Sequence, residues 1–445
     1  MQTFFEDLCG KHLHFVGING VGVNALAKYC FDAGATVSGS DRKLGDFCKY
    51  FAEHGCKIVE GSDIRLVEDA DAVVFTTAIN ESNTELLHAR ELGIPTFERH
   101  EFLSLVSKNF DTVVGIAGSH GKTTVTAMVA HILKETNKNF VAMIGGDAIN
   151  LSNYVNNMSG DGEKIFVTEA CEYRRHMLAL DPSVAVLLNT DWDHPDSYPT
   201  RESIEEAFAE FLKKAKTKVF ACGNSVTMQD ASGKTTFEYE AKHGETRVYL
   251  DKEYIGALCD MRGEYQKKNA LFAIATAYAL GVNPRDALKA TRTFAGVKRR
   301  FEKVGEIDGV PVIFDFAHHP TEIKNLLERA GEYGKILAVF QPHTYSRTKA
   351  YMTEFADVFA DKSNNIGTLI LLPTYAAREP KDEANDSDAL AGRIMSKNAK
   401  LNVYLAKDNT SSVEFVNMLA KSHDIVLFVG AGDIYDLKKC FDMQK

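Results

Sequence analysis

Residues 115–124, which read Gly-Ile-Ala-Gly-Ser-His-Gly-Lys-Thr-Thr, constrain the fold more than any other stretch of the chain. The apolar run 112–116 before them predicts a buried strand, and 125–133 after them predicts a helix. A glycine-rich turn between a strand and a helix points several backbone N–H groups at one anion. Lys122 adds a positive charge for the outer phosphates of a nucleotide, and the Thr123 hydroxyl can bind Mg²⁺. The stretch therefore predicts a nucleotide-binding α/β unit.

The spacing departs from the strict P-loop pattern in one place. That pattern requires glycine at position 116, where this chain has Ile116. The alternative is an ordinary glycine turn ahead of a helix. The intact Gly121-Lys122-Thr123, the shortening of the loop at Gly118 and the flanking strand and helix favour a phosphate loop.

Length, composition and charge bound the function. A chain of 445 residues is too long for one ordinary core, so two or three domains are expected. With 45% hydrophobic and 25% charged residues it resembles a normal soluble globular protein. A formal charge of −10, without a long basic run, argues against nucleic acid as a partner.

The cysteines and the apolar runs indicate the compartment. The eight cysteines are scattered and form no C-x-x-C pair, so they suggest neither a disulfide framework nor a cysteine zinc site. The first residues lack a signal-peptide pattern, and no apolar run has the length of a membrane span. We expect a cytoplasmic protein without membrane insertion.

The N-terminal stretch has the pattern of a doubly wound nucleotide domain. A strand at 13–16, a turn at 17–22, a helix to residue 32 and a strand at 35–39 follow one another. The dinucleotide fingerprint places glycines at 17, 19 and 22, but Asn19 replaces the middle one, and Asp41 stands where a ribose-binding carboxylate would. NAD, a UDP-sugar and mere fold architecture all remain open. Further strands at 72–75 and 93–97 complete a domain that ends near Ser107.

Two polar segments follow strands of the second domain. The strand 164–168 ends in Glu169, and a carboxylate at a strand end beside a phosphate loop is a natural Mg²⁺ ligand. The strand 183–188 leads to His194, which can be a metal ligand, a phosphate contact or part of an acid-capped helix start. The phosphate loop and Glu169 favour the metal or phosphate role. Residues 231–250 predict a two-stranded excursion, and 267–279 predict a helix.

A third α/β unit begins at residue 312. Its predicted strands are 312–316, 336–341, 368–373, 402–405 and 425–429. Polar clusters follow three of them, at 317–320, 341–347 and 430–433. Ligands of parallel sheets gather at the carboxyl ends of strands, so three histidines and an arginine there predict a polar site.

Together these motifs resemble the Mur ligase family across the whole chain. Gly118 to Thr124 matches the family's short phosphate loop, which accounts for Ile116. Residues 169–172 resemble its acidic metal motif, with Cys171 where Asp is common, and 189–198 resemble its D-H-x-D-x-Y segment. In the first domain the matching segments are 17–22, 40–41, 76–79 and 98–101. In the third domain they are 294–301, 315–322, 340–348, 372–377 and 430–434, of which Asp-Phe-Ala-His-His-Pro-Thr-Glu at 315–322 is the most specific.

The resemblance implies an α/β fold of three domains. These are a UDP-sugar-binding Rossmann-like domain at 1–107, a central ATP-binding P-loop domain with a parallel-rich sheet at 108–302, and a C-terminal Rossmann-like ligase domain at 303–445. The implied enzyme joins L-alanine to the carboxylate of UDP-N-acetylmuramate through an acyl phosphate, releasing ADP and phosphate, in peptidoglycan precursor synthesis. ATP and Mg²⁺, with Mn²⁺ as an alternative, are the implied cofactors, and the chain is expected to be a monomer or homodimer.

Three other functions stay open. A murein peptide ligase joins the same UDP-sugar to a recycled tripeptide. An NAD-dependent oxidoreductase would fit residues 13–41 but leaves the phosphate loop unexplained. A non-catalytic nucleotide-binding regulator is disfavoured by the intact Lys122, Thr123, Glu169 and His194.

The resemblance also implies roles for individual residues. The catalytic residues are Lys122, His194, His343 and Arg347, the last two at the amino-acid end. The ATP ligands are Gly118, Ser119, His120, Gly121, Lys122, Thr123, Thr124, Gln266, Asn269, Arg300 and Asp315. The UDP-sugar ligands are Gly20, Val21, Gly22, Ser40, Asp41, Thr77 and Arg99. The metal ligands are Thr123, Glu169 and His194. Several other positions depart from the family pattern: Tyr265-Gln266 replace His-Asn, Phe314 replaces Asp, and Asn19 and Asn24 alter the first-domain turn.

Overall fold

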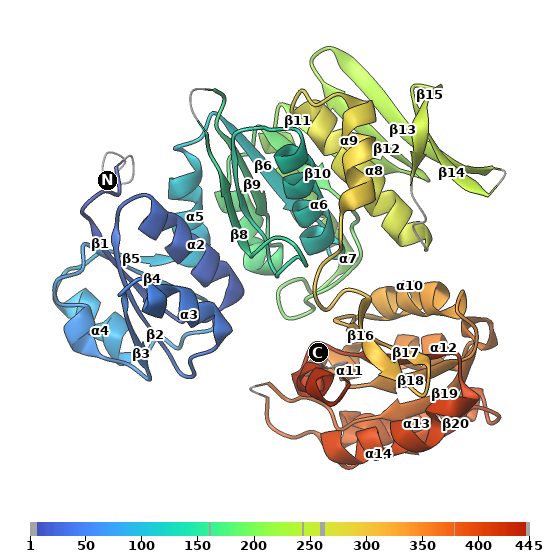
Figure 1. Cartoon of the computed structure of the whole chain (residues 1–445). Coiled ribbons are helices and arrows are strands. Elements are labelled where there is room, and N and C mark those ends of the chain that lie inside the picture. Colours follow the sequence, from blue (N-terminus) through green and yellow to red (C-terminus); the bar gives the residue numbers. More distant parts are fainter. Residues whose placement is uncertain (1–6, 160–161, 243, 259–262, 378, 442–445) are drawn as a thin grey trace. The chain divides into compact units, whose positions relative to one another are not determined.

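The computed structural model of the chain describes residues 7–159, 162–242, 244–258, 263–377 and 379–441. The chain divides into two compact units, Met1–Cys259 with Lys268–Ala295 and Asp260–Lys267 with Gly296–Lys445. The first unit contains two β-sheets and the second contains one (Figure 1). The predicted domain limits at residues 107 and 302 stay a prediction.

The first sheet is parallel throughout, in the order β3-β2-β1-β4-β5. Its strands are β1 (His12–Val16), β2 (Thr36–Asp41), β3 (Lys57–Glu60), β4 (Ala72–Phe75) and β5 (Thr96–Glu98). Its helices are α2 (Val21–Asp32), α3 (Asp46–Glu53), η1 (Ile64–Leu66), α4 (Thr84–Glu91) and α5 (Arg99–Ser107). The strand order reverses between β1 and β4, and ligands of such sheets bind outside the carboxyl ends at that point.

Ten strands form the second sheet, in the order β15-β14-β13-β12-β11-β10-β6-β9-β7-β8. The parallel ones are β6 (Thr112–Ala117), β7 (Phe140–Met143), β9 (Ile165–Glu169), β10 (Val184–Leu187) and β11 (Thr217–Cys222). Antiparallel strands flank them: β8 (Tyr154–Asn157) at one end, and β12 (Ser225–Asp230), β13 (Gly233–Lys242), β14 (Glu245–Leu250) and β15 (Glu253–Leu258) at the other. The predicted two-stranded excursion is therefore a four-stranded antiparallel extension of the main sheet.

The helices of this sheet begin with α6 (Lys122–Glu135), which packs on β6, β7 and β9. The others are η2 (Tyr173–Ala179), α7 (Arg201–Lys214), α8 (Glu264–Ala279), α9 (Pro284–Ala290) and η3 (Thr291–Thr293). Most of α6 is buried, because Val125, Val129 and Ile132 face the core. The predicted helix at 267–279 is confirmed as part of α8.

Register brings three strand ends of the second sheet together. Ile116 of β6 pairs with Glu169 of β9, and Ala117 pairs with Leu187 of β10. The loops after β6, β9 and β10 therefore leave the sheet at one edge. This edge carries the phosphate loop and the two polar segments that the sequence singled out.

The third sheet has the order β16-β17-β21-β18-β19-β20. Its strands are β16 (Glu302–Ile307), which is antiparallel, and the parallel β17 (Val310–Asp315), β18 (Ile336–Phe340), β19 (Ile366–Leu371), β20 (Asn402–Leu405) and β21 (Ile425–Val429). Its helices are α10 (Pro320–Gly331), α11 (Tyr345–Ala350), α12 (Met352–Ala360), η4 (Lys362–Asn364), η5 (Glu383–Asn385), α13 (Ser387–Lys397), α14 (Asn409–Leu419), η6 (Ala420–Ser422) and η7 (Asp433–Cys440). Since β17, β21 and β18 are neighbours, the three predicted polar clusters leave one edge.

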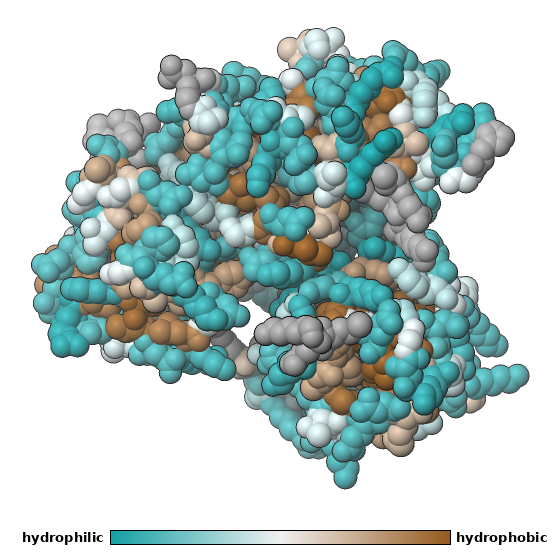
Figure 2. All heavy atoms as spheres, in the orientation of Figure 1, coloured by the Kyte–Doolittle hydropathy of each residue, from teal (hydrophilic) through white to brown (hydrophobic). Residues whose placement is uncertain are grey.

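Hydrophilic side chains prevail on the face shown in Figure 2, with hydrophobic side chains in small groups between them. No helix among the described residues combines the length and apolar character needed to cross a membrane. The seven cysteines in the described part of the chain are all free, and Cys259 lies outside the described residues.

Candidate active site

The phosphate loop depends on two glycines in the left-handed region. Gly118 has φ +134°, and a Cβ there would lie 3.0 Å from the Cβ of Leu188. Gly121 has φ +88° and forms the N-cap of α6. Ile116, where the strict pattern requires glycine, is a fully buried residue of β6. The loop therefore starts two residues later than in the strict pattern.

Lys122 is the centre of the loop. Its Nζ donates to the carbonyl of Gly118 at 2.5 Å and to that of Ser119 at 3.2 Å. The same atom lies 2.8 Å from the Glu172 carboxylate, which is buried. Burial disfavours both charges, but their mutual attraction prevails, so the pKa of Lys122 is raised and that of Glu172 is lowered. The two residues form a buried ion pair at the floor of the loop.

Glu172 also holds the segment that follows β10. His194 Nε2 lies 3.3 Å from the Glu172 carboxylate, and the Tyr198 hydroxyl donates to the Glu172 carbonyl. Glu172 belongs to the acidic motif at 169–172, but sequence reasoning predicted no role for it. The sequence feature that could have revealed this role is the second carboxylate of Glu-Ala-Cys-Glu. Only the first, the strand-end Glu169, was predicted to bind the metal.

Further bonds tie the segment after β10 to the phosphate loop. The amide N–H of His120 donates to Asn189 Oδ1 at 3.1 Å, and Asn189 Nδ2 donates to the His120 carbonyl at 2.9 Å. The Ser119 hydroxyl donates to the carbonyl of Asp191. The alternative of an acid-capped helix start is wrong here, because α7 begins later and is capped by Thr200.

The predicted metal ligands hold different partners. Glu169 ends β9, and its Oε1 accepts the N–H of Gly145 at 2.6 Å. His194 contacts Glu172, as described above, and has the unusual φ of +54°. Thr123 lies in the first turn of α6, and Thr124 beside it is buried. Glu169 is the last residue of β9, and Thr123 lies in the helix that follows β6, the strand next to β9.

In the first domain the turn after β1 is held by β2. The N–H groups of Gly17 and Ile18 donate to the carbonyl of Ser40 at 2.8 and 3.1 Å. The N–H of Asn19 donates to Asp41 Oδ2 at 2.9 Å. The Ser40 hydroxyl is buried and donates to Glu85 at 2.6 Å. The predicted UDP-sugar ligand Ser40 thus supports the turn through its carbonyl, while its hydroxyl is used inside the core.

The other predicted UDP-sugar residues surround the start of α2. Gly20 is the N-cap, Val21 and Gly22 form the first turn, and Thr77 follows β4. A Cβ on Gly22 would lie 3.2 Å from Arg99 Nη1, so this guanidinium covers the helix start. The two departures from the family pattern, Asn19 and Asn24, donate to the carbonyls of Lys43 and Phe47. They tie the turn to the start of α3.

In the second unit Asp315 holds the turn that carries two arginines. Its carboxylate accepts the N–H groups of Phe301 and Ala317, both at 2.7 Å. Burial raises the pKa of Asp315. The Arg300 guanidinium lies 3.4 Å from Glu322, and Arg299 covers the ring of Phe316. These contacts favour a positioning role for Asp315.

Phe314, where the family commonly has Asp, is a core residue. It is buried and stacks on Phe428 of β21, with ring centroids 4.6 Å apart. Its side chain faces away from the strand-end cluster in which Asp315 lies, since successive residues of a strand alternate faces.

His343 and Arg347 lie in the loop and helix that follow β18. The His343 ring stacks on Tyr375, with centroids 5.7 Å apart, and lies 5.8 Å from the ring of His318. Burial and the nearby Arg347 lower the pKa of His343 to about 4, so its ring is neutral at pH 7. Thr344 between them has φ +64°, a strained conformation for a β-branched residue.

The third cluster joins the same edge through Gln341. Its Nε2 donates to Asp433 at 2.7 Å, and its Oε1 accepts the N–H of Ile434 at 3.1 Å. The structure thus brings the three predicted clusters of this unit together.

Two predicted ATP ligands lie in α8. Gln266 is in its first turn. Asn269 is buried, and its Nδ2 is a buried donor without a hydrogen-bond acceptor among the described residues. A buried amide of this kind is costly unless a ligand or water accepts its hydrogen bond.

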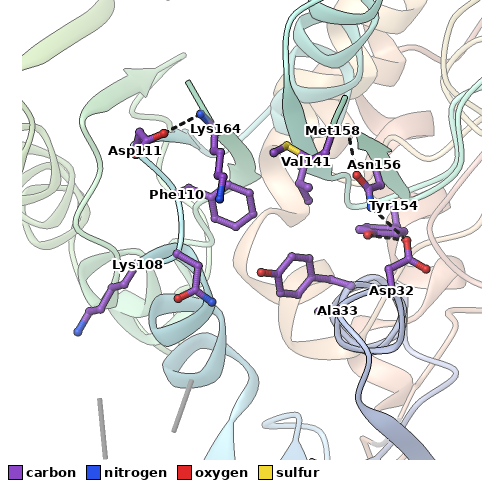
Figure 3. A pocket seen from close by; sticks show the side chains of 12 residues that line it. Asp32, Ala33, Lys108, Phe110, Asp111, Val141, Tyr154, Asn156, Met158 and Lys164 are labelled. Atoms are coloured by element: carbon purple, nitrogen blue, oxygen red, sulfur yellow. Dashed lines mark hydrogen bonds between the residues drawn. The ribbon is translucent and has the colours of Figure 1, made fainter. Parts of the chain in front are cut away.

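A cleft of about 530 Å³ lies elsewhere in the first unit (Figure 3). Tyr29, Asp32, Phe110 and Tyr154 are among its lining residues, with Tyr154 donating to Asp32 at 2.9 Å. Phe110 precedes β6, so the cleft lies at the sheet edge opposite the phosphate loop. No predicted site residue lines it.

Three family models match successive parts of the chain. They are "Mur ligase family, catalytic domain" at residues 12–111, "Mur ligase middle domain" at 116–277 and "Mur ligase, glutamate ligase domain" at 299–432. A UDP-N-acetylmuramate–L-alanine ligase of Caldanaerobacter subterraneus subsp. tengcongensis is 36% identical over 459 residues, which cover 97% of each chain.

Solved structures agree with the fold. The UDP-N-acetylmuramate-alanine ligase of Thermotoga maritima superposes with a TM-score of 0.74 at 25% identity, covering 97% of this chain and 98% of that one. A murein peptide ligase from Psychrobacter arcticus gives a TM-score of 0.68 at 21% identity, covering 97% and 98%, a likeness that shows the fold alone. The predicted α/β fold of three domains is confirmed.

Proposed function

The chain belongs to the Mur ligase family, and we propose that it is the ATP-dependent ligase that joins L-alanine to the carboxylate of UDP-N-acetylmuramate. The observation that carries this assignment is the identity of 36% along nearly the full chain to a relative named for that reaction. In the reaction, the carboxylate attacks the γ-phosphorus of ATP and ADP leaves. The amine of L-alanine then attacks the acyl phosphate, phosphate leaves, and an amide remains. The NAD-dependent oxidoreductase is thereby disfavoured.

We propose that the phosphate loop holds the β- and γ-phosphates. Its N–H groups and Lys122 would neutralise negative charge along the transferring phosphoryl group, which is the main task in this chemistry. Glu172 fixes the ammonium of Lys122 at the floor of the loop. The loop also shares two hydrogen bonds with Asn189, which tie it to the segment after β10.

The residues at this edge fit a magnesium ion. Thr123 offers a hydroxyl oxygen and Glu169 a carboxylate that Gly145 holds in place, and oxygen donors are those that Mg²⁺ prefers. His194 adds an imidazole, a donor that Mn²⁺ accepts more readily. A bound ion would supply positive charge for the phosphate oxygens. We predict that His194→Ala raises the Mg²⁺ concentration needed for half-maximal rate. An unchanged metal titration would assign His194 a packing role beside Glu172 instead.

The two outer domains would bind the other substrates. The start of α2, which has no side-chain cap among the described residues and lies beside the Arg99 guanidinium, is suited to the diphosphate of the UDP-sugar. Gly20, Val21, Gly22, Asp41 and Thr77 lie around that point, and Ser40 supports it from behind. In the second unit we assign Arg300 to ATP, with Asp315 as its support, and His343 and Arg347 to the amino acid. Because the proposed reaction consumes ATP, we propose that it takes place in the cytoplasm.

The experiment that tests this function measures phosphate release with ATP and UDP-N-acetylmuramate across a set of amine acceptors. We expect release with L-alanine at far lower acceptor concentration than with L-Ala-γ-D-Glu-meso-diaminopimelate. The reverse preference would make the protein a murein peptide ligase. ATP hydrolysis or nucleotide binding without any amide product would support the regulator.

A further inference from the structure

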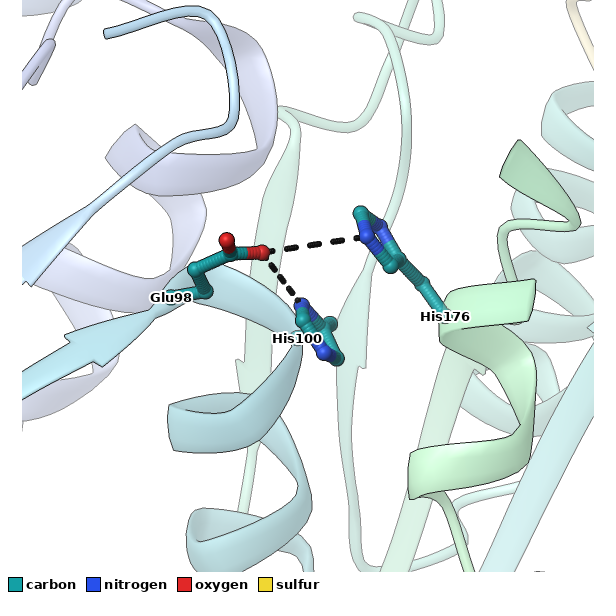
Figure 4. A group of neighbouring side chains, drawn as sticks. All are labelled: Glu98, His100 and His176. Atoms are coloured by element: carbon teal, nitrogen blue, oxygen red, sulfur yellow. Dashed lines mark ion pairs between the residues drawn. The ribbon is translucent and has the colours of Figure 1, made fainter. Parts of the chain in front are cut away.

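Outside the phosphate-loop region, one cluster of histidine and carboxylate side chains meets between the first and central domains. Among the described residues, Glu98, His100 and His176 are the group of His, Cys, Asp or Glu whose ligand atoms all lie within 4.8 Å of one another. Figure 4 shows Glu98 and His100 at the β5–α5 corner and His176 on η2, with the Glu98 carboxylate beside both rings.

The distances are close to those of a coordination shell. The Glu98 Oε2 atom lies 3.2 Å from His100 Nδ1 and 3.8 Å from His176 Nε2. With bonds of about 2.0–2.1 Å, two donors at a tetrahedral zinc are about 3.3 Å apart. The three ligand atoms are near enough for one ion, but the two rings are parallel in this structure, so each ring has to tilt toward the ion to bind it.

The Glu98 carboxylate caps α5, and the two histidine rings lie beside it. The two imidazole rings stack in parallel, with centroids 3.9 Å apart and planes 3° apart. Burial lowers the pKa of His100, and burial with His100 and Arg99 nearby lowers that of His176 to about 4. Both rings are neutral at pH 7 and offer lone pairs, while neither forms the full ion pair that would need a protonated ring.

The backbone also presents His176 in an unusual way. Arg174 and Arg175 immediately before it have φ of +48° and +60°, a costly conformation for two successive residues other than glycine. The side chains of Glu98, His100 and His176 are 29%, 21% and 11% exposed. Solvent can therefore supply a fourth donor.

We propose that Glu98, His100 and His176 bind a divalent transition-metal ion of the zinc class, at a site separate from the proposed ATP site. Two imidazoles and one carboxylate form a donor set that zinc accepts readily and magnesium does not favour. The ion would link the β5–α5 corner of the first domain to η2 of the central domain. It would also lie next to Arg99, which covers the start of α2. The inference does not depend on the proposed ligase activity.

The test measures Zn²⁺ binding by calorimetry on the metal-stripped full chain, in millimolar Mg²⁺ so that magnesium sites are filled. We expect one Zn²⁺ per chain for the wild type. His100→Ala and His176→Ala should each weaken Zn²⁺ binding by about a hundredfold or more, because loss of outer partners alone costs about 10- to 100-fold. The histidines are chosen because Glu98 also caps α5. Co²⁺ in place of Zn²⁺ should give a spectrum without the charge-transfer band of a thiolate ligand.

One control variant makes the result specific. His88→Ala removes a histidine of the first domain that lies between Glu68 and Glu91, at 3.8 and 3.7 Å, without a three-donor cluster. It should bind Zn²⁺ as the wild type does. Wild-type affinity in both His100→Ala and His176→Ala, or no binding by the wild type, would overturn the proposal.

Discussion

At the scale of single residues, the buried pair of Lys122 and Glu172 dominates the phosphate loop. Two buried charges are stable in the folded protein only because each neutralises the other. Removing one leaves the other charged and unpaired, which costs about 3–5 kcal/mol of stability. The same lysine is the group we assign to the phosphates, so its loss has two separable effects.

We predict that Lys122→Ala abolishes ligation and lowers the melting temperature, while the affinity for the UDP-sugar stays nearly the same. The double variant Lys122→Met with Glu172→Gln should recover most of the stability, because no buried charge is left, and should stay inactive. Thermal unfolding, calorimetry with the UDP-sugar and phosphate release separate these effects. A double variant that regains activity would show that Lys122 acts on stability alone.

A second residue-scale prediction concerns Arg347 and the choice of amino acid. L-alanine has a single methyl as its side chain, so its carboxylate must provide much of the binding. Arg347→Lys keeps the charge but loses the planar fork of the guanidinium. We expect kcat/KM for L-alanine to fall roughly ten- to a thousandfold, as for a lost charged hydrogen bond of ~1.5–3 kcal/mol and a misplaced amine.

The control for Arg347 is Arg393→Lys on α13, an exposed position away from the strand-end clusters. The KM values for ATP and the UDP-sugar should change much less than that for L-alanine. If the ATP KM rises while L-alanine is unaffected, Arg347 binds phosphate and our assignment is wrong.

Sequence reasoning predicted the loops that carry the site well. It predicted the contacts of the individual side chains less well. Lys122, Glu169, His194 and the strand-end clusters were found from their position after apolar strands. The partner of Lys122 was missed, because Glu169 and Glu172 are both carboxylates and only the fold shows which one lies under the loop. Ser40 has a residue type suited to a ligand contact, yet its hydroxyl bonds the buried Glu85.

At the scale of elements, the β6–α6 loop and the end of β10 fit together through Gly118. A side chain at Gly118 would need both an unfavourable φ and space that Leu188 and Asn189 occupy. We predict that Gly118→Ala lowers stability by about 1–3 kcal/mol and weakens ATP binding at least tenfold. Urea unfolding and nucleotide titration measure the two effects.

The matched control for Gly118 is Gly223→Ala in the β11–β12 turn. Gly223 also has a positive φ, +58°, but a Cβ there would meet no atom within 4 Å. We expect a small loss of stability and unchanged ATP binding. Equal losses of stability and ATP affinity in the two variants would show that the positive φ of Gly118, and not its packing against the end of β10, causes the effect.

Sequence reasoning found strands with a continuous apolar run between turns most readily. The buried β1, β4, β6, β10, β18 and β21 were found in this way. The strands β3, β7, β8, β11, β12, β15 and β16 were not predicted. Of these, β3, β8, β15 and β16 are terminal strands of their sheets and carry exposed or half-buried residues, so pairing with a neighbour, and not local composition, makes the strand. The buried β7 is an exception, since its four apolar residues were still not predicted as a strand.

At the scale of the whole molecule, the first and central domains share one compact unit, joined by a hydrophobic cluster with residues of both and by buried polar contacts. The fully buried Asn153 of the central domain donates to the carbonyl of Val21 at 3.0 Å and to Asn24 Oδ1 at 3.3 Å. It also accepts from Lys28 Nζ at 3.1 Å. These hydrogen bonds contact the start of α2, next to the turn that we propose binds the UDP-sugar.

We predict that Asn153→Ala lowers stability by about 1–3 kcal/mol, because Val21 and Asn24 lose buried partners. The KM for the UDP-sugar should rise more than the KM for ATP. Asn156→Ala is the control, since Asn156 also reaches across to Asp32, at 3.3 Å, but is exposed. If both KM values rise together, Asn153 stabilises the whole unit and has no specific effect on the turn.

The three sheets also have a consequence for how the chain is made. In the described part of the chain, the first sheet uses strands within residues 12–98, the second within 112–258 and the third within 302–429. No sheet borrows a strand from another of these stretches. Each sheet can therefore form once its own stretch has left the ribosome. In the third sheet the last strand, β21, lies between β17 and β18, so these two strands gain their shared neighbour only after residues 425–429 have been translated.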